Sequence, residues 1–299
     1  RVRRGAIHAL IGPNGAGKTT CFHLLSKFLT PTSGRILYND HDITSMKPAD
    51  VARLGLVRSF QISAVFGHLT ALENVALGVD KVYPKASTAE RQDVVEYYLE
   101  RVGLADAMDK SAADMSNGMK QRVGIARAFA LSPKLLLLDE PFGMLDSLTR
   151  WELQEVLMEV WKRTRVTAVC VTHDVDEAIL LADRIVMMTN GPRATIGKIL
   201  KVDLPRPRDR TAMNSDPAFK ALRADVTNYL INAADAARTG SAAGDESRQA
   251  PNVTPIVPPA RRLPAIYRKA AASPVERKYL EIFEAKKVYP TPKGPLTVL

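Results

Sequence analysis

The stretch Gly12-Pro13-Asn14-Gly15-Ala16-Gly17-Lys18-Thr19 decides the fold class of this chain. It fits the pattern G-x-x-x-x-G-K-[ST], in which glycines let the backbone wrap closely around phosphate oxygens. A short apolar run at residues 6–11 precedes the loop, and a helical pattern from residue 18 to about residue 29 follows it. A strand, a glycine-rich loop and a helix N-terminus in this order form an anion cradle, because the loop N–H groups and the helix dipole both face the ligand.

Within this loop the side chains divide the work of holding a nucleoside triphosphate. Lys18 is expected to reach the β- and γ-phosphates, and the hydroxyl of Thr19 is expected to ligate Mg²⁺. The alternative is a glycine-rich turn with an incidental lysine, which the strand and helix on either side disfavour. The predicted nucleotide-binding residues of the loop are Gly12, Asn14, Gly15, Gly17, Lys18, Thr19 and Thr20.

An acidic pair ends the apolar run Leu135-Leu136-Leu137-Leu138-Asp139-Glu140. Four consecutive leucines indicate a strand buried on both faces of a parallel sheet. Such sheets place ligands at the carboxyl ends of their strands. Asp139 is therefore predicted to hold the Mg²⁺ shell through water, and Glu140 to polarise an attacking water as general base. The alternative is an ordinary exposed strand end that carries acids.

A histidine follows another apolar strand pattern. His173 comes directly after the pattern at residues 166–171. It is predicted to contact the γ-phosphate or the attacking water, although a lone histidine is more often structural.

A second anion cradle is predicted where Ser116, Asn117 and Gly118 begin a helix that runs to about residue 131. Because this cradle is far from Lys18 along the chain, it indicates a site shared by two subunits. The alternative is a plain N-cap at Ser116.

Strand and helix patterns alternate along the chain, which predicts an α/β fold with a mostly parallel sheet. The composition changes near Pro205-Arg206-Pro207, and a C-terminal helical extension is expected over residues 206–239. Residues 240–299 are rich in proline, alanine and basic residues, so we predict a disordered basic tail there, with one isolated short helix at residues 279–287.

Composition excludes a wholly disordered, a fibrous and a disulfide-stapled chain. The chain has 299 residues, of which 46% are hydrophobic and 25% are charged, as in ordinary globular proteins. Its two cysteines cannot form a disulfide framework and favour a reduced compartment. No apolar run approaches the roughly 18–20 residues that span a bilayer, so a soluble or peripheral protein is expected. The net charge of +10 fits a solvated basic surface, the alternative being an anionic partner.

Taken together, the motifs resemble those of the nucleotide-binding subunits of ABC transporters, which are P-loop NTPases. The resemblance covers about residues 1–205 and implies a head-to-tail dimer that holds two ATP molecules, each between the phosphate loop of one subunit and the signature of the other. It also implies a helical subdomain at about residues 62–131, and that Gln61 completes the γ-phosphate and metal site near the membrane subunit. The elements that carry the resemblance are residues 12–19, Gln61, Ser116-Asn117-Gly118, Asp139-Glu140, Asp146 and His173.

The chain departs from the family pattern in two places. The family signature, similar to LSGGQ, here reads Met115-Ser116-Asn117-Gly118-Met119. Asparagine tolerates a left-handed backbone better than most residues, so this cradle is expected to survive. Only eleven residues precede Gly12, so the antiparallel strand and the adenine-stacking aromatic that the family carries before the loop are expected to be missing. That predicts an exposed sheet edge and weaker ATP binding.

The resemblance changes along the chain. Residues 5–75, with Arg58-Ser59-Phe60-Gln61, resemble the ATPases of branched-chain amino-acid importers. From about Leu72 onward the chain resembles the nitrate, sulfonate and taurine importer group, with the nitrate subunits nearest, notably around Asp139-Glu140 and over residues 183–200. The second segment is longer and its motifs are more distinctive, so it favours nitrate or a related small anion as the transported solute.

The resulting hypothesis is the ATP-hydrolysing subunit of an importer, with ATP and Mg²⁺ as cofactors. Glu140, His173 and Gln61 are the expected catalytic residues, and the expected metal-binding residues are Thr19, Gln61 and Asp139. Ser116, Gly118 and Asp146 are expected to act in nucleotide binding. The implied partners are a second ATPase subunit, identical or not, integral membrane permease subunits and, indirectly, a solute-binding protein.

This hypothesis places the protein peripherally on the cytoplasmic face of the cell membrane, with no nucleic acid as partner. Three alternatives stay open. The chain is an ATPase of a branched-chain amino-acid importer, a non-transport ABC ATPase that acts on nucleic acid or ribosomes, or an inactive truncated fragment. The basic tail favours the second of these, whereas a single phosphate loop opposes it.

Overall fold

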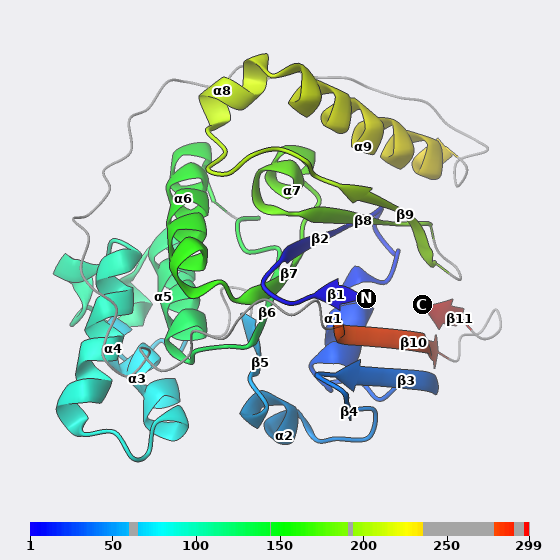
Figure 1. The fold of residues 1–299 in the computed structure, drawn as a ribbon. Helices are drawn as coiled ribbons and strands as arrows, with labels where there is room; N and C mark the ends of the chain where they lie inside the picture. Colours follow the sequence, from blue (N-terminus) through cyan, green and yellow to red (C-terminus); the bar gives the residue numbers. More distant parts are fainter. Residues whose placement is uncertain (60–64, 144, 191–193, 236–277, 290–295, 299) are drawn as a thin grey trace.

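A mostly parallel sheet and an antiparallel sheet organise the fold (Figure 1). The computed structural model describes residues 1–299 except 60–64, 144, 191–193, 236–277, 290–295 and 299. The first sheet has the strand order β5-β6-β7-β2-β8-β9, and only β9 runs antiparallel to its neighbour. This confirms the predicted α/β class. Its strands are β2 (Ile7–Ile11), β5 (Leu56–Ser59), β6 (Leu135–Asp139), β7 (Thr167–Val171), β8 (Arg184–Met188) and β9 (Ile196–Lys201).

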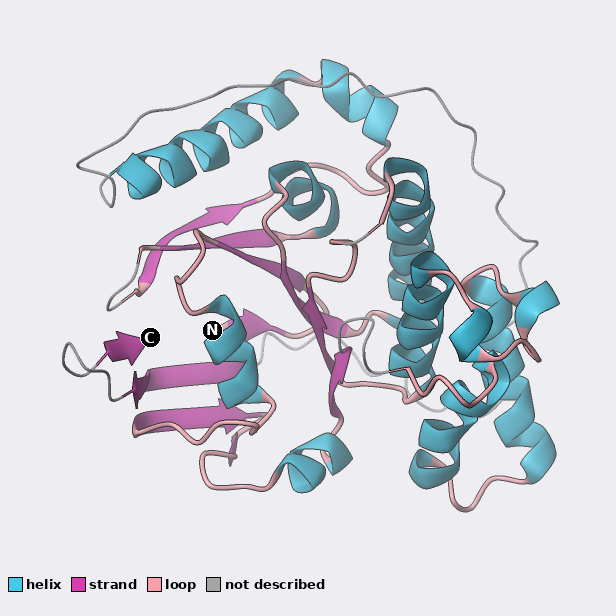
Figure 2. Ribbon diagram, turned by 180° about the vertical axis from the view of Figure 1, so that it is seen from behind, coloured by secondary structure: helices cyan, strands magenta, loops and turns pink. Residues whose placement is uncertain are grey.

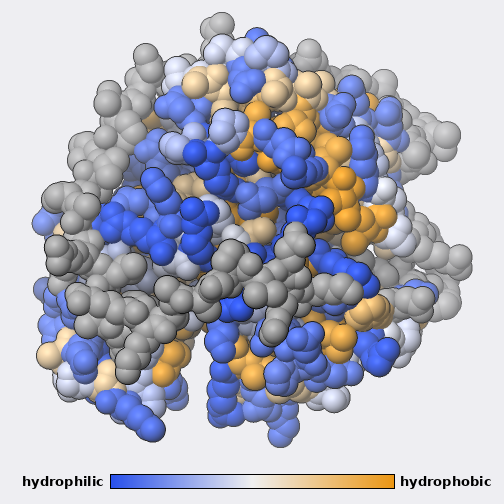
Figure 3. Space-filling model, in the orientation of Figure 1, coloured by the Kyte–Doolittle hydropathy of each residue, from blue (hydrophilic) through white to orange (hydrophobic). Residues whose placement is uncertain are grey.

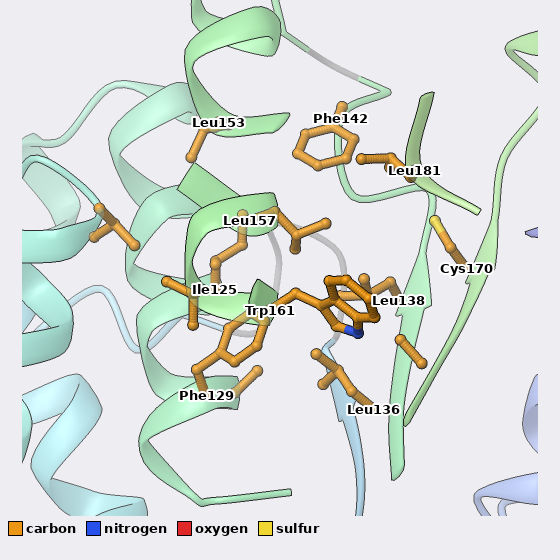
Figure 4. Packing of buried hydrophobic residues seen from close by; sticks show 14 of the residues in the cluster. Ile125, Phe129, Leu136, Leu138, Phe142, Leu153, Leu157, Trp161, Cys170 and Leu181 are labelled. Atoms are coloured by element: carbon orange, nitrogen blue, oxygen red, sulfur yellow. The ribbon is translucent and has the colours of Figure 1, made fainter. Parts of the chain in front are cut away.

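The two faces of this sheet pack against different partners. Successive strand residues point to opposite faces, and β6 is buried throughout. Leu136 and Leu138 join a core with α6 (Ser147–Thr164) and α7 (Val175–Leu181). Leu135 and Leu137 join a second core with α1 (Lys18–Leu25) and the antiparallel sheet. Figure 4 shows Leu157 and Trp161 of α6 packed toward the β6 leucines. The unbroken apolar run therefore reflects burial on both sides.

Three helices form a separate group beside the sheet, seen from behind in Figure 2. They are α3 (Ala71–Val82), α4 (Thr88–Arg101) and α5 (Asn117–Ala130), and they pack against one another. Capping boxes begin the first two, where Thr70 pairs with Glu73 and Ser87 with Glu90. These helices lie within the range expected for a helical subdomain. Two 3₁₀ turns, Ala105–Ala107 and Ala112–Asp114, lie between α4 and α5 along the chain. The short helix α2 (Pro48–Arg53) lies apart from this group, beside β5.

The antiparallel sheet is where the structure differs most from the sequence prediction. Its strand order is β1-β10-β3-β4, and β11 also pairs with β10. The helix predicted at residues 279–287 is wrong, because these residues lie in strand β10, and the disordered tail is wrong for β10 and β11. The strands are β1 (Val2–Arg3), β3 (Ser33–Tyr38), β4 (His41–Asp42), β10 (Lys278–Tyr289) and β11 (Leu296–Val298). The rest of the predicted tail, at residues 240–277, 290–295 and 299, lies outside the described residues.

Long-range pairing explains why β10 is a strand. It pairs with β3, for example Leu280 with Tyr38, and with β1, where Leu280 faces Val2. The hydroxyls of Tyr38 and Tyr279 lie 3.2 Å apart and are buried. These two residues are separated by 241 positions along the chain, so no local pattern reveals the pairing. The antiparallel strand that we expected to be missing before the phosphate loop is present in short form as β1, which pairs with β10. The predicted exposed sheet edge is wrong for this side of β3, because β10 covers it.

The helices α8 (Arg210–Ser215) and α9 (Pro217–Asp235) follow the sheet, and α9 packs on α7 (Figure 1). Two arginines before α8 hold this extension in place. Arg208 Nη1 donates to the backbone oxygens of Ile179 and Ala182, at 2.7 Å each. Arg206 pairs with Asp183 at 2.9 Å. The contacts of Arg208 satisfy carbonyl groups at the end of α7 that the helix leaves unpaired.

The outer edge of the mostly parallel sheet has both apolar and basic side chains. Figure 3 shows apolar surface in the region of β9, where Ile196 and Ile199 are about half exposed. Lys198 and Lys201 lie on the same strand and are exposed. Lysines on an edge strand discourage pairing with another sheet. Among the described residues, no helix is both long and apolar enough to cross a membrane.

Strand β10 gives a direct test of this arrangement. Leu280 is 1% exposed, whereas Ile282 on the same strand is 41% exposed. Leu280→Ala should lower the free energy of unfolding by about 2–4 kcal/mol, because it opens a cavity in a filled core. Ile282→Ala should cost less than about 1 kcal/mol. Urea unfolding followed by circular dichroism measures both, and equal losses in the two variants would contradict the placement of β10.

Candidate functional site

Three neighbouring strands end in one row, and the candidate site lies at that row. Leu10 of β2 pairs with Val171 of β7, and Val171 pairs with Asp139 of β6. The phosphate loop begins two residues after Leu10, and His173 comes two residues after Val171. The parallel register therefore places the loop, Asp139 and the segment with His173 at the same edge of the sheet, where α/β folds bind ligands.

The phosphate loop has the backbone shape that its glycines permit. Gly15 and Gly17 have φ angles of 82° and 86°, in the left-handed region that other residues avoid. Gly17 is the N-cap of α1 and provides no side-chain cap, so the first N–H groups of α1 are left for an anion. A Cβ on Gly12 would lie 2.9 Å from Met188 Cβ, which explains the need for glycine there. Thr19 and Thr20 lie in the first turn of α1.

Lys18 lies folded over its own loop. Its Nζ donates to the backbone oxygens of Gly12 at 2.7 Å and Pro13 at 3.0 Å. Burial lowers the pKa of Lys18, and the charges of Glu140 and Asp139 oppose that shift. The ammonium group is thus within electrostatic reach of both acids. Phosphate oxygens offer it stronger, charge-assisted hydrogen bonds than the two carbonyl groups do.

Asp139 is the last residue of β6 and forms a buried ion pair. Arg58 Nη2 lies 2.6 Å from Asp139 Oδ2, and the two side chains are 8% and 5% exposed. Arg58 is on β5, whose Ser59 pairs with Leu138 of β6. Arg58 was not among the predicted site residues, because only the strand order joins β5 to β6. Gln61, three residues further on, lies outside the described residues.

Glu140 and His173 come together beside the loop. Glu140 has a φ of 45°, an uncommon left-handed conformation for a residue other than glycine, and its N–H donates to Val171 O at 2.9 Å. His173 Nδ1 lies 3.6 Å from Glu140 Oε1. The side chains are 62% and 35% exposed, so solvent reaches both. Backbone strain of this kind clusters at active sites, where it aims a side chain.

A buried carboxyl group supports the segment that carries His173. Glu177 of α7 is 4% exposed, and Gln154 Nε2 of α6 lies 3.4 Å from its Oε2. Its backbone N–H donates to Asp174 Oδ1, which caps α7. Burial raises the pKa of Glu177 to about 8, and the charge of Asp174 adds to the shift. The carboxyl group therefore favours its protonated form at neutral pH.

The signature residues line a second candidate site, which is a pocket at the start of α5 and α6. Ser116 caps α5, because its Oγ accepts from Met119 N–H at 3.2 Å. Asp146 caps α6 by accepting from Thr149 N–H at 3.0 Å, and this bond lowers the pKa of Asp146. Both caps border one pocket of about 560 Å³, which Gly118 also lines. Two helix N-termini thus face a single pocket, so the plain cap and the anion cradle are compatible interpretations.

The described residues do not bring this pocket to the phosphate loop. Figures 1 and 2 both show α5 and α1 on different sides of β6. The phosphate loop, Asp139, Glu140 and His173 gather at one site. The signature helix and the start of α6, with Ser116, Gly118 and Asp146, gather at another. One chain therefore carries two separate halves of the predicted nucleotide site.

The donor atoms at the loop fit magnesium. Thr19 offers a hydroxyl and Asp139 a carboxylate, and Mg²⁺ prefers oxygen ligands. This ion is usually held by one or two carboxylates together with substrate phosphates. Within the described ranges, no group of three or more His, Cys, Asp or Glu side chains is placed to hold a metal by itself. The arrangement fits a metal that arrives with a nucleotide.

Known proteins, most of them named as transport proteins, have similar sequences. The family profile described as "ABC transporter" matches residues 1–143. The bicarbonate transport ATP-binding protein CmpC of Synechococcus elongatus is 48% identical over 229 residues, which cover 77% of this chain and 34% of CmpC. The nitrate transport protein NasD of Klebsiella oxytoca is 44% identical over 230 residues, covering 77% of this chain and 86% of NasD. The chain thus spans about a third of CmpC and most of NasD.

Solved structures give the same fold. The dimeric ATP-binding cassette MJ0796, in a post-hydrolysis state bound to ADP and Pi, matches with a TM-score of 0.62 and 27% identity. The match covers 69% of this chain and 89% of that one. The fold is therefore that of an ATP-binding cassette.

The buried Glu177 predicts how stability depends on pH. Its pKa is about 8 in the folded chain against 4.5 as the ordinary value, so stability is lost as pH rises between these values. Glu177→Gln should remove that loss and exceed the parent in unfolding free energy by at least about 1 kcal/mol at pH 8.5, with little difference at pH 4.5. Urea unfolding across this pH range measures the effect. Asp225→Asn, at an exposed carboxylate, is the control, and equal pH profiles for parent and Glu177→Gln would refute the assignment.

Proposed function

This chain belongs to the ABC transporter family, and on that premise we propose that it is the ATP-binding and ATP-hydrolysing subunit of an importer for nitrate or a related small anion. The observation that carries the ATPase part is the meeting of Lys18, Asp139, Glu140 and His173 at the ends of neighbouring strands. The names of the relatives, which include a nitrate and a bicarbonate transport protein, support the solute class.

The phosphate end of the nucleotide is held by the loop. The N–H groups at the start of α1 face the phosphates, and Lys18 exchanges two carbonyl partners for phosphate oxygens. Thr19 and Asp139 would hold Mg²⁺, which when bound supplies charge neutralisation on the β- and γ-phosphates. The loop geometry is already formed, so binding needs little reorganisation of the backbone.

Glu140 is the residue that we propose activates water. Its side chain is partly exposed at the strand end, and the positive φ fixes where it leaves the backbone. His173 Nδ1 lies 3.6 Å from Glu140 Oε1, which supports the proposal that His173 holds the γ-phosphate or the same water. Phosphoryl transfer depends mainly on positioning and electrostatics, which these groups supply. Gln61 is proposed to complete this site.

The second half of the site is proposed to serve the nucleotide of a partner subunit. The pocket at Ser116, Gly118 and Asp146 is lined by two helix N-termini, which suit a phosphate. The solved relative MJ0796 is dimeric, which supports this arrangement. The partner is a second copy or a related ATPase subunit. Permease subunits and a solute-binding protein complete the proposed importer, and this subunit lies on the cytoplasmic face of the membrane.

Removal of the base should separate binding from turnover. Glu140→Gln keeps the size and hydrogen-bonding capacity of the side chain but not its basicity. Steady-state ATP hydrolysis should fall at least about 100-fold, with ATP affinity within about threefold of the parent. In the parent, hydrolysis per chain should rise with protein concentration, because two chains complete each site. Undiminished hydrolysis by Glu140→Gln would remove Glu140 from this role.

The solute class needs a cellular test. In a Klebsiella oxytoca strain that lacks NasD, this chain should restore growth on nitrate as sole nitrogen source, since 44% identity covers most of that protein. The variant Glu140→Gln is the matched control and should restore nothing. Absence of growth, with an active purified ATPase and normal expression, would reject nitrate and leave the ATPase assignment intact.

A further inference from the structure

The ion pair between Arg58 and Asp139 is buried on both sides. The two atoms are 2.6 Å apart, and each side chain is less than a tenth exposed. Asp139 is also the carboxylate proposed to hold the metal, so the pair places a permanent positive charge on a metal ligand. A guanidinium group stays charged at any relevant pH. Water screens little of this interaction, because both partners are buried.

The structure holds Arg58 in place from two sides. Its strand β5 is hydrogen-bonded to β6, with Ser59 opposite Leu138. Its guanidinium carbon lies 5.9 Å from the ring centroid of Phe22, a fully buried residue of α1. Helix α1 is also the helix that begins at Lys18 and Thr19. Arg58 therefore connects the two elements that supply the proposed metal ligands.

The positive charge of Arg58 has two opposite effects at this site. Without metal, Arg58 neutralises Asp139 and so reduces the repulsion between this carboxylate and nucleotide phosphates. With metal, the same positive charge repels Mg²⁺ and competes for the oxygen atoms of Asp139. Both effects bring the nucleotide affinity measured without Mg²⁺ closer to the nucleotide affinity measured with Mg²⁺.

We infer that Arg58 is a positioning residue that acts as the resident counter-cation of Asp139 and sets how strongly nucleotide affinity depends on Mg²⁺. This inference rests on the proposed function, because it needs a nucleotide at the phosphate loop. It assigns a role to a side chain that the ATPase mechanism above does not use. It also gives β5 a direct electrostatic link to the metal site.

The test is equilibrium titration of the full chain with AMP-PNP, a non-hydrolysable ATP analogue, by calorimetry. Each variant is measured once with MgCl₂ and once with EDTA, and the dissociation constant in EDTA is divided by that in MgCl₂. Arg58→Gln should weaken binding in EDTA, strengthen binding in Mg²⁺ and raise the ratio about tenfold, as expected for one charge a few ångströms from an ion. Arg58→Lys keeps the charge but not the planar guanidinium that stacks on Phe22, so its ratio should stay within about threefold of the parent even if both affinities change.

A matched control uses another arginine that pairs with an aspartate. Arg53 lies 2.7 Å from Asp50, but its side chain is 78% exposed. Arg53→Gln should leave the ratio unchanged. If the ratio in Arg58→Gln equals that of the parent, or both affinities fall together, Arg58 has only a structural role and the inference is wrong. If the parent itself does not bind AMP-PNP, the proposed function fails instead.

A second measurement covers the case in which Arg58→Gln does not fold. The Nε–H resonance of Arg58 in the parent, assigned by its loss in Arg58→Lys, should shift more with AMP-PNP and Mg²⁺ than with AMP-PNP and EDTA. An identical position in both states would overturn the inference, because a counter-cation must respond to a metal at Asp139.

Discussion

The parallel pairing of β2, β7 and β6 is the constraint on which the proposed site depends. Leu10, Val171 and Asp139 occupy one row across these strands. A shift of one residue in either pairing would reverse the faces of a buried strand and move the acid away from the loop. The leucines on both faces of β6 oppose such a shift, since each face is packed against its own core. Core packing thus fixes the chemistry at the strand ends.

Two cores on opposite faces of the sheet give the site its rigid support. The core with α6 and α7 supports the segment that carries His173. Helix α7 follows this segment and begins at the Asp174 cap. The core with α1 and the antiparallel sheet holds the phosphate loop from the other side. Strand β10 belongs to this second core through Tyr279 and Leu280. The end of the chain therefore contributes to the support of a loop near its beginning.

The parts of the fold that can be predicted from sequence are those with a local signal. Residues 12–19, the leucine run before Asp139 and the start of α5 at Ser116 each carry their pattern within a few residues. Strand β10 has no such signal, because its partners in β1 and β3 are distant along the chain. Arg58 was missed for the same reason, since only the strand order places it beside Asp139. The roles of Ser116 and Asp146 toward a partner's nucleotide stay predictions.

Equilibrium binding tests most directly whether the row of strand ends is a nucleotide-binding site. AMP-PNP with Mg²⁺ is titrated into the full chain and into Lys18→Ala, in which the loop loses its charged side chain but keeps its glycines. We expect saturable binding of one nucleotide per chain by the parent and a loss of at least about tenfold in affinity in the variant. Equal binding by both chains, or no binding by a folded parent, would contradict the proposed site.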